Sequence, residues 1–171
     1  MTQEQIKARH EAAHIVVGAL LGMVCHQATL TCFGVGSMTA EGGAEMGDRT
    51  LLPFTTLMAV DGAGYVSDVK CDTPHDLALA HAGGDLLNVE QLYPKDPKLK
   101  ATKSCSNSNF FLGLGVGLAM PLVYDDANWK AIEVLAEFML AEHRLGKVTI
   151  PKTDLYAQIQ GLINIDQRCL A

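Results

Sequence analysis

The chain of 171 residues is long enough for one domain with a sizeable core, and its 49% apolar content excludes an intrinsically disordered protein. Its formal net charge of −6, with 13 basic residues, argues against nucleic acid as a partner, because phosphate binding depends on clustered lysine and arginine. The five cysteines lack zinc-knuckle or redox spacing, and neither a signal sequence nor a long apolar span is present, so we expect a cytoplasmic protein without a membrane segment.

The N-terminal part of the chain predicts a helix followed by a strand. Thr2 has capping-box spacing to Gln5, and Gly22 follows the last apolar residue at helical spacing, so the first helix should lie between them. Residues 25–39 contain alternating apolar and polar side chains, which predicts a strand. Residues 40–50 are rich in glycine and charged residues, which predicts a loop.

The central part predicts two helices and an irregular segment. Residues 53–69 form a helix rich in small side chains, which allow another backbone to approach closely. A third helix begins at residues 73–74 (Thr-Pro) and stops at the two glycines of residues 83–84, and residues 85–92 can form a further short helix. Residues 93–117 are the least regular and predict an insertion or loop.

The C-terminal part predicts a long amphipathic helix over residues 128–145, capped by Asp125 or Asp126. A last helix is expected over residues 152–165. No internal repeat or linker interrupts the sequence, so we predict a single domain over residues 1–171, mainly α with a small β portion.

The candidate chemistry lies in residues 10–14, which read His-Glu-Ala-Ala-His. On a helix, His10 and His14 are one turn apart and project from one face, so their imidazoles can share a metal ion. Glu11 is rotated by about 100° from His10 and can reach a water on the open side of that metal. Zinc there would activate the water, and the carboxylate of Glu11 would accept its proton, as in zinc peptidases generally.

A catalytic zinc site needs a third protein ligand. The candidates are acidic and histidine side chains in the middle of the chain: Glu41, Glu45, Asp48, Asp72, His75, Asp76 and His81. Asp76 is in the first turn of the third predicted helix, where the helix dipole favours a carboxylate with or without a metal. His75, its neighbour, is a candidate to orient a ligand.

Two segments of the chain resemble the FtsH-type zinc metalloproteases. Residues 10–18, His-Glu-Ala-Ala-His-Ile-Val-Val-Gly, are similar to the family's His-Glu-Ala-Gly-His-Ala-Val-Val signature. Residues 72–77, Asp-Thr-Pro-His-Asp-Leu, are similar to its Asn-Asp-Leu segment, and the small-residue helix at residues 53–69 resembles the family helix that ends Gly-Gly-Arg-Ala-Ala-Glu.

The resemblance implies an FtsH-like peptidase domain of zincin-type helical fold. It implies a zinc metalloendopeptidase, a hydrolase in which His10, His14 and Asp76 bind Zn²⁺ and Glu11 is catalytic. Because the family's membrane anchor and ATPase are not found in these residues, we expect cleavage of flexible peptides or unfolded proteins. A separate unfoldase and a homo-oligomer are compatible with this expectation. Residues 28–32 are a candidate edge strand for substrate pairing, and they fit an ordinary half-buried strand equally well.

Two other functions are compatible with the same residues. A regulatory or interaction module could keep the FtsH-like fold and the metal but have little or no catalytic activity. Alternatively, two histidines and one carboxylate also suit non-haem iron, which would indicate an oxygen- or redox-active metal protein. A peptide-cleavage assay with and without chelator separates the first alternative from a peptidase, and metal analysis of the purified protein separates the second.

Overall fold

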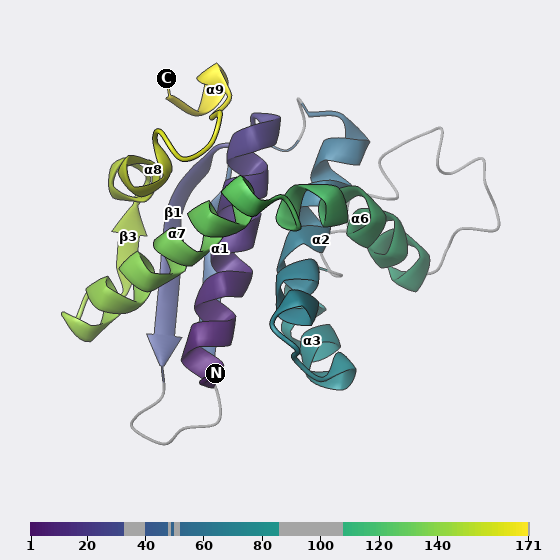
Figure 1. Cartoon of the computed structure of the whole chain (residues 1–171), viewed down its shortest axis with the longest axis horizontal. Coiled ribbons are helices and arrows are strands. Elements are labelled where there is room, and N and C mark those ends of the chain that lie inside the picture. The colour runs from purple at the N-terminus through teal and green to yellow at the C-terminus, as the bar shows by residue number, and fades with distance from the viewer. Residues whose placement is uncertain (33–39, 48, 50–51, 86–107, 171) are drawn as a thin grey trace.

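The computed structural model describes residues 1–32, 40–47, 49, 52–85 and 108–170. These residues form a mainly helical protein with one small antiparallel sheet (Figure 1), which confirms the predicted fold class at that coarse level.

Helix α1 (Gln3–Leu21) is the central element, and the other layers pack around it (Figure 1). Its start is fixed by the predicted capping box, in which the Thr2 side chain accepts from the Gln5 backbone and the Gln5 side chain accepts from the Thr2 backbone. It ends at Gly22, whose φ of 79° lies in the left-handed region that glycine adopts without strain. Most of α1 beyond its first turn is buried, because helices cover one side of it and the sheet covers another.

The sheet has the strand order β2-β1-β3, with every pair antiparallel. β1 (Cys25–Cys32) lies in the middle, between β2 (Ala40–Met46) and β3 (Thr149–Pro151), so that Ala28 pairs on both sides. The prediction of a loop over residues 40–50 is therefore wrong for residues 40–46. Gly42 and Gly43 lower the strand propensity of this segment, and the hydrogen-bonded ladder with β1 overrides it.

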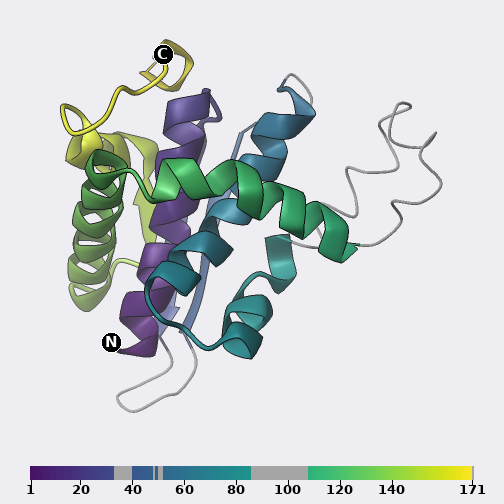
Figure 2. The same ribbon diagram turned by 45° about the vertical axis from the view of Figure 1, so that its right-hand side comes forward.

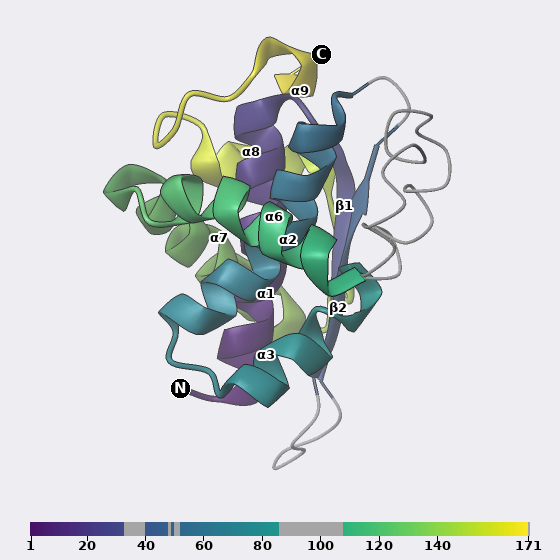
Figure 3. The same ribbon diagram turned by 90° about the vertical axis from the view of Figure 1, so that its right-hand side faces the viewer.

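The position of β1 also excludes it as the open edge for a substrate. β2 pairs along its length on one side, and on the other side β3 pairs with residues 27–29 and the Val148 carbonyl accepts from Leu30, so residues 28–30 of the candidate segment 28–32 have no free side for an added strand. Among the described strands, β2 pairs on one side with β1 and forms an edge of the sheet. Figure 3 shows α1 and α2 on the same side of β1 and β2, so this edge runs alongside the helices.

Helix α2 (Phe54–Lys70) packs against α1 on one side and against α6 (Ser108–Val123) on the other (Figure 2). A Cβ at Gly62 would collide with the backbone of Gly115, and a Cβ at Gly115 would lie 2.5 Å from the Met58 carbonyl oxygen. The two backbones therefore meet directly, as the small residues predicted. The irregular segment expected at 93–117 is wrong for residues 108–117, which are helical, and its remainder lies outside the described residues.

Four further named helices, α3, α7, α8 and α9, complete the fold of the described residues. α3 (His75–His81) begins just after the predicted Thr-Pro start, with Pro74 as its N-cap. It ends at His81, and the glycines of residues 83–84, which were predicted to stop it, belong to a separate helical turn over residues 83–85. α7 (Asp126–Arg144) is capped by Asp125, whose side chain accepts from the Asn128 backbone at 3.0 Å.

The expected last helix is shorter than predicted: α8 (Lys152–Ile159) ends before a turn, and α9 (Gln167–Leu170) follows. None of the helices in the described part of the chain combines the length and apolarity that crossing a bilayer would need.

Candidate metal centre

Helix α1 brings the motif residues into the interior of the protein. His10, Glu11 and His14 are all buried, and the two imidazole centroids are 4.9 Å apart. The one-turn spacing of the two histidines thus places both rings on the same face of α1, the face that packs against α2.

The Nδ1 atom of each imidazole is held by a group on α2. His14 Nδ1 lies 2.6 Å from the Val60 carbonyl oxygen, and His10 Nδ1 lies 3.0 Å from Asp68 Oδ2. A carbonyl oxygen and a carboxylate only accept hydrogen bonds, so both Nδ1 atoms donate and each Nε2 atom is the available ligand. Such partners fix both the tautomer and the ring orientation before a metal binds.

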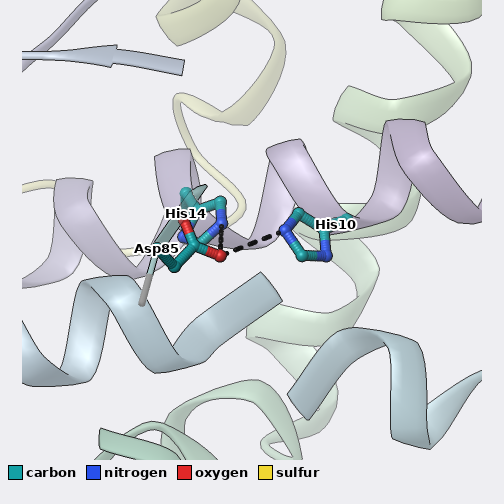
Figure 4. A group of neighbouring side chains, drawn as sticks. All are labelled: His10, His14 and Asp85. Carbon is teal, nitrogen blue, oxygen red and sulfur yellow. Dashed lines mark ion pairs between the residues drawn. The ribbon is translucent and has the colours of Figure 1, made fainter. Parts of the chain in front are cut away.

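Asp85 completes a group of three potential ligands (Figure 4). Its Oδ2 atom lies 3.3 Å from Nε2 of His10 and 3.3 Å from Nε2 of His14. Two atoms that bind one zinc ion at about 2.0–2.1 Å with a tetrahedral angle lie about 3.3 Å apart. The separations of Asp85 from both imidazoles therefore fit a shared metal ion.

Two of these atoms are buried without a hydrogen bond among the described residues, namely His14 Nε2 and Asp85 Oδ2. The two atoms face each other at 3.3 Å as an ion pair. Burial without a hydrogen bond is costly for polar atoms, and a metal ion between them would bind both. Burial by itself would lower the pKa of His14, but the carboxylate of Asp85 has the larger opposite effect, so the pKa is raised to about 9. Burial raises the pKa of Asp85, but the two imidazoles hold it well below its usual range. A metal ion at Nε2 would displace the His14 proton.

The third ligand in this group is not the residue that the resemblance implied. Asp76 is exposed in the first turn of α3, and the metal-binding groups found among the described residues do not include it. Its position is explained by the helix dipole alone. Asp85 comes instead from the helical turn after the two glycines of residues 83–84, and the sequence placed it only as the first residue of a short predicted helix.

The remaining ligand candidates have other positions. Asp72 and His75 are exposed, and His75 Nδ1 lies 2.8 Å from the Tyr65 hydroxyl, so it does not orient a ligand here. Glu45 is exposed and accepts from Gln27 at 2.6 Å. Asp48 and the side chain of Glu41 lie outside the described residues.

The last candidate, His81, lies beside the site but contacts it through a shared carboxylate. Its Nδ1 atom is 2.9 Å from Asp68 Oδ2, the same oxygen that accepts from His10. The His10, Asp68 and His81 group could also hold a metal ion, but it shares His10 with the first group. The contacts with both histidines outweigh burial and lower the pKa of Asp68. Asp68 therefore acts as a buried anion that positions two imidazoles.

One face of α2 is adapted to these imidazoles. Val60, Gly64 and Asp68 are four residues apart, so they lie in one row along the helix. A Cβ at Gly64 would lie 2.5 Å from His14 Nε2 and closer still to His10 Nε2. Any side chain at this position would occupy the space next to the ligand atoms, which explains why the row contains glycine at its centre.

His10, His14 and Asp85 line a cavity of about 610 Å³. Its other walls come from α1, β2, α2, α3 and the segments near them, through Lys7, Glu11, Gly42, Gly43, Ala44, Met46, Arg49, Asp61, His81 and Gly84. Glu11 Oε1 lies 2.8 Å from Lys7 Nζ, and a Cβ at Gly42 would lie 2.9 Å from Glu11 Cγ. The predicted catalytic carboxylate is thus in the cavity, between the metal ligands and the edge strand.

No family model, curated protein or solved structure matches this chain. The case for its function therefore depends on the geometry of the site and on the resemblance of its motifs.

Proposed function

We propose that the protein is a zinc-dependent metallopeptidase with an FtsH-like, zincin-type domain. One observation carries the proposal: Asp85 Oδ2 lies 3.3 Å from Nε2 of both His10 and His14, a separation that suits two ligands of one tetrahedral zinc ion, beside a cavity that contains Glu11. The His-Glu-Ala-Ala-His motif and the small-residue helix that packs against it are consistent with the family resemblance.

Zinc is the metal that we infer for this site. Two imidazole nitrogens and one carboxylate oxygen leave one tetrahedral position open, which is typical of catalytic zinc. The same donors also accept iron. Metal analysis of protein purified without added metal decides between them: about one equivalent of zinc supports the proposal, and iron in its place would indicate an oxygen- or redox-active protein.

Each residue of the site has a role in this reaction. His10, His14 and Asp85 would hold the zinc, which supplies the Lewis acidity that activates water and polarises the peptide carbonyl. Glu11 accepts a proton from the attacking water at its carboxylate and delivers it to the leaving amine. Asp68 and the Val60 carbonyl keep the imidazoles oriented throughout.

The substrate that we infer is an extended peptide segment. β2 is an edge strand and four of its residues, Gly42, Gly43, Ala44 and Met46, line the cavity, so a peptide pairing with β2 would lie against Glu11. An extended segment is available in a flexible or unfolded chain. In a compact domain it requires local unfolding, which costs up to the full stability of roughly 5–15 kcal/mol. A separate unfoldase would be needed to supply this free energy.

The proposal is tested by Glu11→Gln, which keeps the size of the side chain and removes its basicity. We expect the variant to retain zinc and to lose peptidase activity by roughly 10²- to 10⁴-fold. The assay follows cleavage of an unfolded casein-like substrate and of a stable compact domain, with and without chelator. Unchanged turnover in the variant would remove Glu11 from the mechanism, and equal cleavage of both substrates would contradict the inferred substrate class.

A second candidate function is favoured by the Lys7–Glu11 ion pair. Both side chains are buried, and the ammonium lies 2.8 Å from the carboxylate that must accept a proton. An FtsH-like metal-binding regulatory module would keep this contact and have little or no turnover. Zinc-loaded wild-type protein that leaves unfolded casein and flexible peptides intact would support this function over a peptidase.

A further inference from the structure

A second ion pair lies in the wall of the cavity, apart from the three metal-ligand candidates. Arg49 Nη2 lies 2.6 Å from Asp61 Oδ2, and the side chains are 21% and 4% exposed. Asp61 follows Val60, whose carbonyl oxygen accepts from His14, so α2 holds this pair next to the metal site. Arg49 itself follows β2, the strand that we infer to pair with substrate.

The hydrogen-bonding capacity of Arg49 is not used up by Asp61. A guanidinium has five N–H donors, and the contact with Asp61 uses Nη2. Arg49 Nε is buried and has no hydrogen-bond partner among the described residues. Burial raises the pKa of Asp61 to about 6, even though the nearby Arg49 lowers it. The charge of Arg49 therefore offsets only part of the effect of burying the Asp61 carboxylate. Arg49 lines the cavity and its side chain is 21% exposed, so a ligand oxygen there would accept from guanidinium donors that Asp61 does not use.

The other charges in the cavity are already matched. Among the described lining residues, the other lysine or arginine is Lys7, which pairs with Glu11. Asp85 faces the two imidazoles and would be neutralised further by a metal ion. Arg49 is therefore the cationic group in these walls that is best placed to receive a ligand anion. Arginine suits a carboxylate in particular, because its planar donors match the two oxygens.

We propose that Arg49, held by Asp61, is a carboxylate-binding group that selects peptides with an acidic side chain or a free C-terminal carboxylate. The inference deepens the proposed peptidase function and depends on it for the identity of the ligand as a peptide. The carboxylate of the bound peptide would lie in the same cavity as the bond that is cleaved. Its contact with Arg49 would contribute to the choice of substrate and not to the chemical step.

The test measures binding without turnover, using metal-free wild-type protein, in which Lys7 keeps its pairing with Glu11, and two pairs of short peptides. The first pair is blocked at both ends and has Glu or Gln at its centre. The second pair has Gln at its centre and ends in a free carboxylate or an amide. We expect one pair to bind at least tenfold more tightly in its carboxylate form, which also shows whether the side chain or the terminus is recognised.

Arg49→Gln should abolish this preference. Arg49→Lys should keep part of it, because lysine retains the positive charge but lacks the planar donors of arginine. Arg144→Gln is the matched control, because it removes the same charge from an exposed position on α7. Arg49→Gln leaves Asp61 buried without its cation and can impair folding. The double variant Arg49→Gln with Asp61→Asn removes both charges together and should likewise bind both members of each pair equally.

Equal binding of both members of both pairs by protein that contains Arg49 would overturn the inference. So would a preference that survives in Arg49→Gln, because another group would then bind the carboxylate. Cleavage of unfolded casein by the wild-type protein is measured separately. A carboxylate preference that depends on Arg49 in a protein that cleaves nothing would support the binding site and refute the peptidase function.

Discussion

Gly64→Ala should strongly weaken metal binding although it adds only one methyl group. A Cβ at this position would lie 2.5 Å from His14 Nε2 and closer to His10 Nε2, whereas real Cβ contacts are essentially never shorter than 3.0 Å. The His14 ring would therefore have to move by at least about 0.5 Å. A metal site depends on ligand distances within about 0.2 Å, so this displacement exceeds what the site tolerates. We expect zinc affinity to fall on the order of 100-fold.

The effect on stability has two opposing parts. Alanine is about 1 kcal/mol better than glycine in a helix interior, whereas inserting a methyl group into a packed site typically costs about 1–3 kcal/mol. The clash involves two imidazoles held by Asp68 and Val60, so we expect net destabilisation of the metal-free protein.

The assay combines zinc affinity, measured by competition with a chromogenic chelator, with thermal unfolding of the metal-free protein. Gly117→Ala is the matched control: Gly117 lies in α6 and an added Cβ would meet nothing within 4 Å. The control should bind zinc normally and be slightly stabilised. If Gly64→Ala binds zinc as tightly as the wild type, the reasoning about ligand placement is refuted.

Three further changes test other parts of the structure. Asp85→Ala should weaken zinc binding, measured by chelator competition, whereas Asp76→Ala should leave it unchanged; the reverse result would restore Asp76 as the ligand. Asp68→Asn removes the negative charge that orients His10, and zinc affinity should fall roughly 10- to 100-fold in the same assay, so an unchanged affinity would show that the contact does not matter. Asp125→Ala removes the cap of α7 and should cost about 1 kcal/mol in urea unfolding at unchanged zinc affinity; unchanged stability would contradict the role of the cap.

Patterns that act over a few residues were sufficient to predict much of the helical structure. The capping box at Thr2, the glycine stop at Gly22 and the cap at Asp125 depend on contacts three or four residues apart, and the structure contains all of them. The strand over residues 40–46 was missed because its stability comes from pairing with β1, and its glycines alone indicate a loop. Helix α6 was missed in part because its glycines are used for packing against α2.

The sequence by itself determined that two imidazoles and a carboxylate share one helix, because His10, Glu11 and His14 lie within a single turn and need no other element to bring them together. Only the tertiary structure decided which acidic group faces the imidazoles, because Asp85 reaches them across 71 residues of chain from His14. Asp76 has the better local signal, a carboxylate in the first turn of a helix, yet that signal reports the helix dipole and not a contact with α1. The same limit applies to Asp68 and Gly64, whose partners are set by how α2 packs against α1, and to Arg49, whose partner Asp61 lies on α2.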